Sequence, residues 1–587
     1  MKIVEIGAAA IMLACAILCN SPVTRAAEVA ADSPRQPFLA RHVPEPVASG
    51  ALTAVSPVDP QQRMQLSVAL PLTHQAQMTQ LLHDLYDRSS PKFHKFLGVD
   101  EFTERFSATQ ADYDAVVSWA TANGFTVTST SRNRRLVAVE GSVDTINRTF
   151  HVTMTHYRHP VENRTFHSAD REPTITGLNV PLLQVTGLDD YVLPHTLLKQ
   201  SAASVKPGLT GSGPSGYYLP SDMRAAYYGN GWLDGLDQQV AVISFNGYLV
   251  SDLNLYYSTT GMSASATVDF FAVNGFGNYS NVCTTVGQPS GYTGSCFDGE
   301  QILDIVNVIG MAPNLDLLWF VAGNDAAQIL NFLADNGGVV QDGPTVATSS
   351  WLWGSSEAAT DDTIFQELQA QGVTFLQASG DGGAFGGTSS WGTSYQYPAD
   401  DPYITVVGGT DLTTTGPGGS WVSETAWADS GGGYVSGISI PSWQQQSGVI
   451  NASNGGSTSW RNAPDVAAEA NFDNVTVNDG TFLVGVGGTS FAAPRWAGYL
   501  ALFNELLVYY SGNFIPSTGF INPTLYSSSM ATGANYSSIF HDITSGSNPS
   551  IGESGFNAVT GYDLVTGWGS PNAGFMNAFL NAYGEQQ

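Results

Sequence analysis

The hydrophobic and polar positions of residues 62–196 repeat with periods of two and of three to four, the periods of strands and helices. Residues 64–72, MQLSVALPL, alternate as a half-buried strand does, and residues 74–87 place apolar side chains at helical spacing. Strands are also predicted at 125–131, 134–141 and 152–159, and helices at 109–124 and 143–150. The order strand-helix-strand-strand-helix-strand is that of a ferredoxin-like α+β domain.

From residue 217 onward, short apolar runs alternate with segments of helical spacing. Strands are predicted at 240–245, within 339–351, at 315–322 and at 373–381, and helices at 299–313, 325–337 and 361–372. This alternation predicts an α/β domain with a mostly parallel sheet and helices on both faces. Active sites of such domains gather at the carboxyl ends of the strands.

Three segments lack such a pattern. Residues 1–27 resemble a secretory signal peptide, with Lys2, an apolar run and small residues before the expected cleavage point. Residues 28–61 are rich in Ala, Pro and Val and are predicted to be a disordered leader. Residues 197–216, LLKQSAASVKPGLTGSGPSG, are predicted to be a linker in which maturation cleavage occurs.

The net charge of −29 is unevenly distributed. Residues 28–200 carry 15 basic and 18 acidic side chains, whereas residues 201–587 carry four basic and 31 acidic ones, a net charge of −27. Such a surface makes nucleic acid and anionic membranes poor partners, and we expect a monomer after processing. Protonation at acid pH would relieve its self-repulsion, so the charge favours an acid-adapted protein over one that is only highly soluble.

Removal of the signal peptide would leave two of the four cysteines, Cys283 and Cys296. In an exported protein they are predicted to form a disulfide, and two free thiols are the alternative.

The segment GVGGTSFAAPRWAG, residues 485–498, contains the candidate nucleophile. An apolar run at 481–486 predicts a buried strand, and a long helix is predicted after Ser490. A serine at this junction can attack a carbonyl while nearby amide groups receive the oxyanion. The alternative is an N-cap serine with no chemical role.

A base for Ser490 is hard to find among the histidines. Nine of the 10 precede residue 200, and only His541 lies in the same half of the chain as Ser490. Glu300 and Asp304 lie four residues apart and therefore on one face of a predicted helix. They could be an exposed acidic stripe, but Glu300 could also take the proton of Ser490 while Asp304 orients Glu300. A carboxylate base works at acid pH.

Asp381 ends the predicted strand 373–381 and precedes the glycine-rich GGAFGG. It is either an Asx turn or, if protonated, a hydrogen-bond donor to the oxyanion.

Four motifs together resemble the sedolisin family of serine-carboxyl peptidases. Three of them are Glu-x-x-x-Asp before GMAPN, Ser-Gly-Asp at 379–381 and Gly-Thr-Ser-x-x-x-Pro at 488–494. The fourth, SSPKFHKFLGVDEFTERF at 89–106, resembles the activation domain of pro-kumamolisin through Pro91, His94, Phe96, Leu97 and Phe102. The resemblance implies a subtilisin-like catalytic domain at 217–587 preceded by a pro-domain at 62–196.

By this resemblance Glu300 corresponds to the general base, Asp304 to its orienting partner, Asp381 to the oxyanion acid and Ser490 to the nucleophile. The implied protein is a secreted, acid-acting endopeptidase that cuts proteins or peptides and is made as a zymogen. Its pro-domain would act as an intramolecular inhibitor. Acid would loosen that domain by protonating its histidines and the carboxylates that face it.

Two segments near the end, 540–549 and 559–572, resemble the calcium site of the family. The implied ligands are the carboxylates of Asp542 and Asp563 and the carbonyl groups of Ile543, Val559 and Gly561. The family pattern usually has glycine where Val559 stands, and turn-capping aspartates are the alternative.

Three other functions remain open on the sequence. A tripeptidyl exopeptidase would use the same chemistry, and an inactive, calcium-stabilised binding protein would use none. A neutral hydrolase would use His541 as its base.

Overall fold

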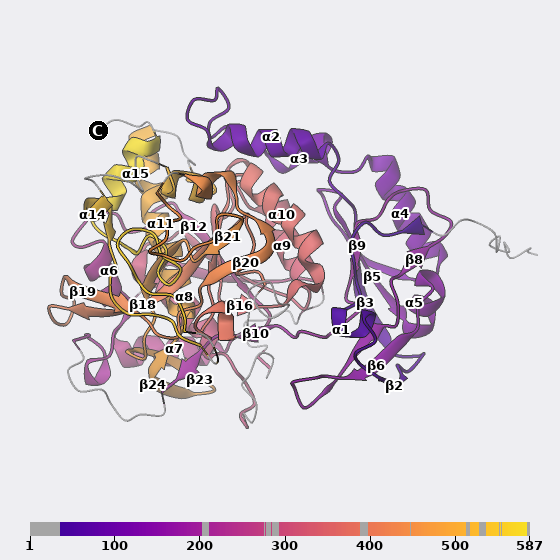
Figure 1. The fold of residues 1–587 in the computed structure, drawn as a ribbon, viewed down its shortest axis with the longest axis horizontal. Coiled ribbons are helices and arrows are strands. Elements are labelled where there is room, and N and C mark those ends of the chain that lie inside the picture. The colour runs from indigo at the N-terminus through magenta and orange to yellow at the C-terminus, as the bar shows by residue number, and fades with distance from the viewer. Residues whose placement is uncertain are drawn as a thin grey trace, which may run out of the picture.

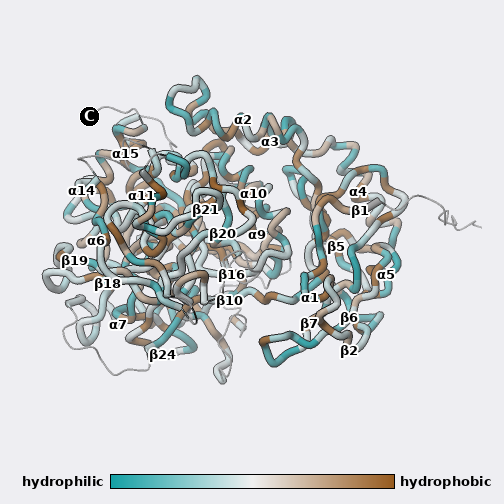
Figure 2. The backbone as a smooth tube through the Cα atoms, viewed as in Figure 1, coloured by the Kyte–Doolittle hydropathy of each residue, from teal (hydrophilic) through white to brown (hydrophobic). Residues whose placement is uncertain are grey.

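The computed structural model describes residues 36–201, 210–263, 265–274, 276, 283–284, 293–387, 397–446, 448–511, 517–527, 536–550, 552 and 554–583. The predicted signal peptide lies outside these residues. Figure 1 shows two parts side by side, a smaller one formed by the first third of the chain and a larger one formed by the rest. In Figure 2 hydrophobic segments lie inside each part and hydrophilic ones mainly at its edges.

The larger part is built on an eight-stranded sheet with the order β13-β14-β12-β15-β17-β18-β19, in which β22 also pairs with β18. Its strands are parallel except for the antiparallel pair β18–β19. Their bounds are β12 (Gln239–Ser244), β13 (Thr267–Ala272), β14 (Leu317–Ala322), β15 (Val346–Ser349), β17 (Thr374–Ala378), β18 (Thr405–Thr414), β19 (Trp421–Ala426) and β22 (Val466–Glu469). The predicted mostly parallel sheet is confirmed.

Helices cover both faces of this sheet. α8 (Gly299–Met311) and α11 (Thr489–Ser511) pack against each other and on one face. α9 (Ala326–Asn336) and α10 (Ala358–Ala370) lie on the side that faces the smaller part (Figure 1). All 13 residues of α8 are buried, which its nearly continuous apolar sequence explains. Further helices are α6 (Pro220–Tyr227), α7 (Val250–Thr260) and α15 (Phe575–Tyr583).

The strand before α11 does not belong to the central sheet. β24 (Thr481–Gly487) pairs with β23 (Asn474–Asn478) on one side and with β11 (Lys199–Gln200) on the other, all antiparallel. It is exposed at its start and buried only over its last three residues. The predicted strand is therefore present, but only its end, next to Ser490, is buried.

The smaller part is α+β, as predicted, and contains two antiparallel sheets. One has the order β4-β5-β3-β9 and the other the order β2-β6-β7. The bounds are β2 (Ala54–Pro57), β3 (Arg63–Ala69), α2 (Gln75–Tyr86), α3 (Val99–Phe106), α4 (Gln110–Ala122), β4 (Thr126–Thr130), β5 (Leu136–Ser142), α5 (Val143–Phe150), β6 (Met154–Arg158), β7 (Thr165–Ala169) and β9 (Gln184–Thr186). One detail of the ferredoxin-like order differs, because β9 takes the edge beside β3 where β6 was expected.

The segment predicted to be a disordered leader is partly ordered. Within residues 36–61, β1 (Gln36–Pro37) pairs with β8 (Thr174–Ile175), α1 spans Glu45–Ala48 and β2 pairs with β6. The physical reason is that β6 lies outside the sheet β4-β5-β3-β9, so one of its edges is available for pairing with β2. The short apolar residues of this segment also pack on the core, as Val43, Val47 and Val58 show.

The smaller part reaches over the larger one at two places. α2 and α3 form an arm that lies across the top of the larger part in Figure 1. The second place is the start of the predicted linker, where β10 (His195–Thr196) pairs with β16 (Trp351–Leu352) and β11 pairs with β24. Residues 197–201 are therefore held in extended form instead of being unstructured.

Candidate active site

Ser490 is the second residue of α11 and follows the end of β24 after two intervening residues, Gly488 and Thr489. The Ser490 side chain is fully buried, and Oγ has no hydrogen-bond partner of normal geometry among the described residues. The Ser490 hydroxyl nevertheless lies close enough to the Glu300 carboxylate to oppose the rise in its pKa. The structure thus places the Ser490 and Glu300 side chains next to each other, as the hypothesis of a carboxylate base requires.

Glu300 and Asp304 occupy successive turns of α8 and are both fully buried. Burial, followed by the charge of Asp304, raises the pKa of Glu300 well above its ordinary value. Burial also raises the pKa of Asp304 well above its ordinary value, while the Ser350 hydroxyl opposes this rise by donating to Asp304 Oδ1 at 2.7 Å. Two buried carboxyl groups this close retain one proton between them over a wide pH range.

Asp381 lies three residues after the end of β17, in a glycine-rich turn. Its Oδ1 accepts hydrogen bonds of 2.8 Å from both the amide and the hydroxyl of Thr489. Its Oδ2 is buried without a partner among the described residues. Burial raises the pKa of Asp381 to about 7, so the carboxyl is protonated in acid.

Gly488 lets two oxygens approach the turn before Ser490. A side chain there would place its Cβ 2.6 Å from Asp381 Oδ2 and 3.0 Å from the carbonyl oxygen of Leu197. The glycine of the Gly-Thr-Ser motif is therefore explained by close approach.

The four predicted catalytic residues share one property. Each has a buried oxygen without a hydrogen-bond partner among the described residues: Glu300 Oε1, Asp304 Oδ2, Asp381 Oδ2 and Ser490 Oγ. Buried polar atoms normally have partners, so these four oxygens are available for contacts with a substrate or with water. A hydroxyl facing a carboxylate, beside a carboxyl that can donate, is an arrangement able to carry out acyl transfer.

Two contacts of the site were not predicted from the sequence. Ser350, which bonds Asp304, lies between β15 and β16, and its place at a strand end was the only available signal. Leu198, from the linker, donates its amide to Glu300 Oε2 at 3.0 Å. Lys199 follows it and contacts the Asp381 carbonyl group and, at 3.0 Å, Asp429 Oδ2.

The start of α8 is fixed by a set of hydrogen bonds. Asn478 Oδ1 accepts from the amides of Asp298 and Gly299 at 3.0 and 2.9 Å. Asp298 in turn accepts from the amides of Leu249 at 2.9 Å and Asp479 at 3.1 Å. These bonds satisfy helix-terminal donors and set the position of Glu300 one residue later.

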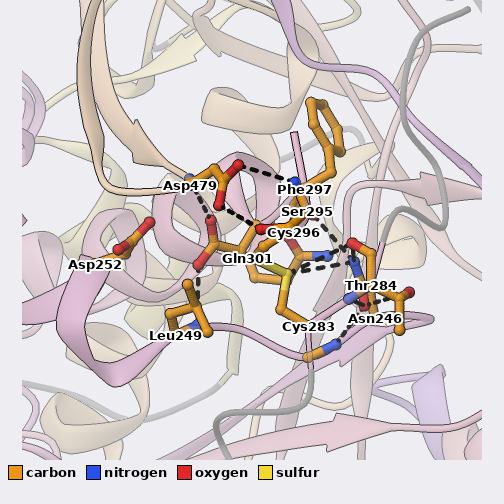
Figure 3. The surroundings of a disulfide bond; sticks show 12 residues. Asn246, Leu249, Asp252, Cys283, Thr284, Ser295, Cys296, Phe297, Gln301 and Asp479 are labelled. Atoms are coloured by element: carbon orange, nitrogen blue, oxygen red, sulfur yellow. Dashed lines mark hydrogen bonds between the residues drawn. A yellow bond between two sulfur atoms is a disulfide. The ribbon is translucent and has the colours of Figure 1, made fainter. Parts of the chain in front are cut away.

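The predicted disulfide Cys283–Cys296 is present next to this helix start (Figure 3). Asn246 Nδ2 donates to the carbonyl groups of Thr284 and Phe297, each at 3.1 Å, and so holds both sides of the bridge. The disulfide therefore closes the loop before α8, and the Asn246 hydrogen bonds attach that loop to the segment after β12.

His541 lies on β25 (Phe540–His541), and its ring stacks on Trp421 with centroids 4.0 Å apart. Burial lowers its pKa to about 4. The carboxyl group beside the Ser490 hydroxyl is Glu300, and no described contact joins His541 to Ser490. This placement disfavours the neutral hydrolase.

The residues predicted to bind calcium lie in two neighbouring segments. Asp542 Oδ1 accepts from the Gly561 amide at 3.1 Å, and Asp563 Oδ2 accepts from the Val559 amide at 3.0 Å. Burial raises the pKa of Asp563 to about 7 and also raises that of Asp542. Burial, followed by the charges of both carboxyl groups, raises the pKa of Tyr536, so the three side chains lie close together.

The donor set fits a hard cation. The carbonyl oxygens of Ile543, Val559 and Gly561 accept no backbone hydrogen bond from the described residues, and the buried Asp563 and the half-buried Asp542 add two carboxyl groups that can act as ligands. The one group of three metal-ligand side chains among the described residues is elsewhere, at Cys283, Cys296 and Asp298. Its sulfurs are already joined in the disulfide, so it is not a metal site.

Comparison with known proteins identifies the family of the chain. Its residues 51–181 match the family "Pro-kumamolisin, activation domain" and residues 285–518 match the "Subtilase family". Kumamolisin of Bacillus sp. (strain MN-32) is 30% identical over 492 residues, which cover 80% of this chain and 83% of kumamolisin. The chain belongs to the sedolisin family of serine-carboxyl peptidases.

Other sedolisin-family proteins match most of the chain as well. Tripeptidyl-peptidase 1 of Rattus norvegicus is 26% identical over 583 residues, which cover 90% of this chain and 94% of that protein. The structure of Pseudomonas sedolisin (serine-carboxyl proteinase) complexed with two molecules of pseudo-iodotyrostatin is 25% identical, with a TM-score of 0.51. It covers 64% of this chain and 99% of the sedolisin chain.

The family assignment confirms the subtilisin-like fold and a serine-type peptidase with an N-terminal pro-domain. The larger part is accordingly called the catalytic domain and the smaller part the pro-domain. Among the described residues, no helix has the length and apolar character that crossing a bilayer requires.

Proposed function

We propose that this protein is a secreted, acid-acting serine-carboxyl endopeptidase that is synthesised as a zymogen. The observation that carries the proposal is the proximity of the Ser490 hydroxyl to the buried Glu300 carboxylate, on which the charges of Asp304 and Asp381 also act. The family supports peptidase chemistry, and the geometry supports a carboxylate in place of the usual imidazole base.

In the proposed reaction Ser490 Oγ attacks the carbonyl carbon of the substrate and its proton passes to Glu300. The Glu300 carboxylate has two donors facing it, the hydroxyl and a main-chain amide, whereas Asp304 has only the Ser350 hydroxyl. We therefore assign the negative charge to Glu300 and the shared proton to Asp304. Protonated Asp381 donates from Oδ2 to the oxyanion. Glu300 then gives its proton to the leaving amine, and water hydrolyses the acyl-enzyme.

Endopeptidase activity is favoured by the path of the pro-domain linker. β10 and β11 pair with the catalytic domain on both sides of the site, so extended chain fits continuously through it. A tripeptidyl peptidase, as one relative is named, must instead close the site around a free amino terminus. An internally quenched peptide with a blocked amino terminus separates the two, since only the endopeptidase cuts it.

We further propose that the pro-domain is an intramolecular inhibitor and that Ca²⁺ is held by the Asp542 and Asp563 carboxylates with the carbonyl groups of Ile543, Val559 and Gly561. The ion would neutralise the charges of the two carboxylates and join the segments that carry them. It has no part in the chemical steps.

The test of the function is a pH–activity profile of the processed protein beside Glu300→Gln, Ser490→Ala and His541→Phe. We expect activity in acid, and a loss of about 10⁴-fold or more in kcat for each of the first two variants. His541→Phe keeps the stacking on Trp421 and should remain active. Activity that survives Glu300→Gln and disappears in His541→Phe would favour the neutral hydrolase, and no activity at any pH would favour the inactive binding protein.

A further inference from the structure

Two strand pairings hold the chain on either side of one dipeptide, Leu197–Leu198. Before it, β10 pairs with β16 through His195↔Leu352 and Thr196↔Trp351. After it, β11 pairs with β24 through Lys199↔Gly487 and Gln200↔Val486. Both pairings are antiparallel, so the backbone is fixed in extended form on both sides and the dipeptide between them has little freedom to move.

The nitrogen of Leu198 lies where a leaving amine must be. Its N–H donates to Glu300 Oε2 at 3.0 Å, the distance needed for a proton to pass from a protonated Glu300 to that nitrogen. Its side chain packs with Leu303, Val486 and Phe491, which form an apolar contact surface beside the site.

The carbonyl oxygen of Leu197 lies on the oxyanion side. This oxygen and Asp381 Oδ2 both lie close to the position that a Cβ atom would take at Gly488. Asp381 Oδ2 has no hydrogen-bond partner among the described residues. The Leu197 side chain is buried, with 9% of its surface exposed. The peptide bond between the two leucines therefore spans from the oxyanion acid to the general base.

We propose that the Leu197–Leu198 bond is the first bond that this protein cuts, so that the precursor is its own first substrate. The inference rests on the proposed peptidase function and adds the processing bond, together with a preference for a large aliphatic side chain on each side of it. Lys199 fixes the leaving side through its ion pair with Asp429 at 3.0 Å and its contact with the Asp381 carbonyl group.

The atoms balance as in hydrolysis of any peptide. Ser490 Oγ bonds to the carbonyl carbon of Leu197 as its proton moves to Glu300. The carbon–nitrogen bond then breaks, and the proton goes to the nitrogen of Leu198. One water molecule cleaves the ester, leaving a carboxyl group on Leu197 and an amino group on Leu198.

The test uses the full-length precursor, purified at neutral pH and then acidified, with intact-mass and amino-terminal sequencing of the earliest products. We expect one pair of fragments, the second beginning Leu-Lys-Gln-Ser. Because the bond already lies in the site of the same molecule, its rate should be first order and should not change over a hundredfold range of protein concentration. A rate that rises with concentration would contradict the proposal.

Three variants sharpen the test. Leu198→Pro removes the N–H that faces Glu300 and should slow this cut by about 10²-fold or more. Leu198→Ala keeps the N–H and should be cut at the same bond. Lys206→Gln, which alters a basic residue elsewhere in the linker, should leave the first cut unchanged.

The outcomes separate this inference from the function on which it rests. If the first cut falls within 202–216 while the processed protein hydrolyses an unrelated peptide, the processing bond is wrong and the peptidase function stands. If neither the precursor nor an added peptide is cut at any pH, and the precursor behaves as Ser490→Ala does, the peptidase function fails and the inference fails with it.

Discussion

The two carboxyl oxygens of Asp381 have different surroundings. Oδ1 accepts from the amide and the hydroxyl of Thr489, whereas Oδ2 has no partner among the described residues and adjoins the hydrogen-only face of Gly488. Two donors already occupy Oδ1, so the proton of the neutral acid belongs on Oδ2. Because burial raises the pKa to about 7, this donor is present below that pH and is lost as the pH rises through it.

Asparagine reproduces this arrangement without a titrating proton. In Asp381→Asn the amide oxygen can accept from Thr489 while the NH₂ group takes the place of protonated Oδ2. We expect this variant to keep at least about a tenth of the kcat of the wild type in acid, and Asp381→Ala to lose about 10²–10³-fold. The decline of kcat as the pH rises through about 7 should be seen in the wild type and be absent from Asp381→Asn. An equal decline in both would assign that titration to another group.

At the level of elements, what could be predicted is what depends on local pattern. The buried faces of α8 and α11 and the strands that alternate with helices follow from spacing within each segment. Glu300 and Asp304 could be paired because four residues of helix place them on one face. Ser350 and Leu198 could not be paired with them, since their contacts join positions 46 and 102 residues apart.

The position of β6 shows the same limit. Its sequence predicts a strand correctly, but strand pattern does not specify a partner. β9, only three residues long, has taken the edge beside β3, and β6 instead pairs with β2 and β7. The unexpected position of β6 thus also explains why β2, within the segment wrongly expected to be disordered, is ordered.

The segments proposed to bind calcium contact the Asp381 turn. The Ala384 amide donates to the Asn548 carbonyl group at 2.8 Å, and Asn548 Nδ2 donates to the Ser430 carbonyl group at 3.0 Å. Loosening residues 540–563 would therefore disturb the turn that holds Asp381. We expect a calcium chelator to lower the midpoint of thermal unfolding of the processed protein and to reduce its activity. Ca²⁺ should restore both, and Mg²⁺ should not, because it demands smaller octahedral geometry.

Two substitutions provide the comparison for this experiment. Asp542→Asn should remove the response to Ca²⁺, whereas Asp237→Asn, at an exposed aspartate, should leave it intact. Unfolding midpoints measured by calorimetry with and without the ion would decide. If chelator and Ca²⁺ shift neither protein, these aspartates only cap turns.

At the level of the whole molecule, acid acts on the contact between the two domains in opposite directions. His94 lies among Tyr86, Phe93, Phe96 and the catalytic-domain Tyr583, and burial alone lowers its pKa to about 3. Its contribution to holding the arm is therefore complete above the ordinary value of 6.5 and is lost as the pH falls toward 3. The difference corresponds to roughly 5 kcal/mol.

The carboxylates that face the pro-domain change the stability of the contact with pH in the opposite direction to His94. Asp335 accepts from the amides of Arg132 and Asn133, and burial raises its pKa to about 6, while burial also raises that of Glu367 beside Asn133. A carboxyl group whose pKa is raised by contact with the pro-domain stabilises that contact in acid. This stabilisation is lost as the pH rises through the raised pKa. The raised pKa values therefore predict that protonation of these two carboxylates holds the pro-domain in place in acid, so we expect acid release to depend on the histidines.

His94→Phe tests the role of this histidine, because it keeps an aromatic ring in place and removes the group that is protonated. We expect His94→Phe to show hydrolysis of an added peptide only at a lower pH than the wild type, by about one unit. Cutting of its own linker should shift less, because that bond already lies in the site. His83→Gln, at an exposed position on α2, should behave as the wild type does. An unchanged pH for peptide hydrolysis in His94→Phe would exclude His94 as the acid-sensitive group.

The pairings of β10 and β11 remain intact when the bond between them breaks. One new end stays paired with β16 and the other with β24, and each belongs to a different fragment. The newly cut enzyme is therefore subject to product inhibition by both of its own termini. We expect a lag between this cut and the onset of turnover, and its length is set by the rate at which β10 and β11 dissociate from their partner strands.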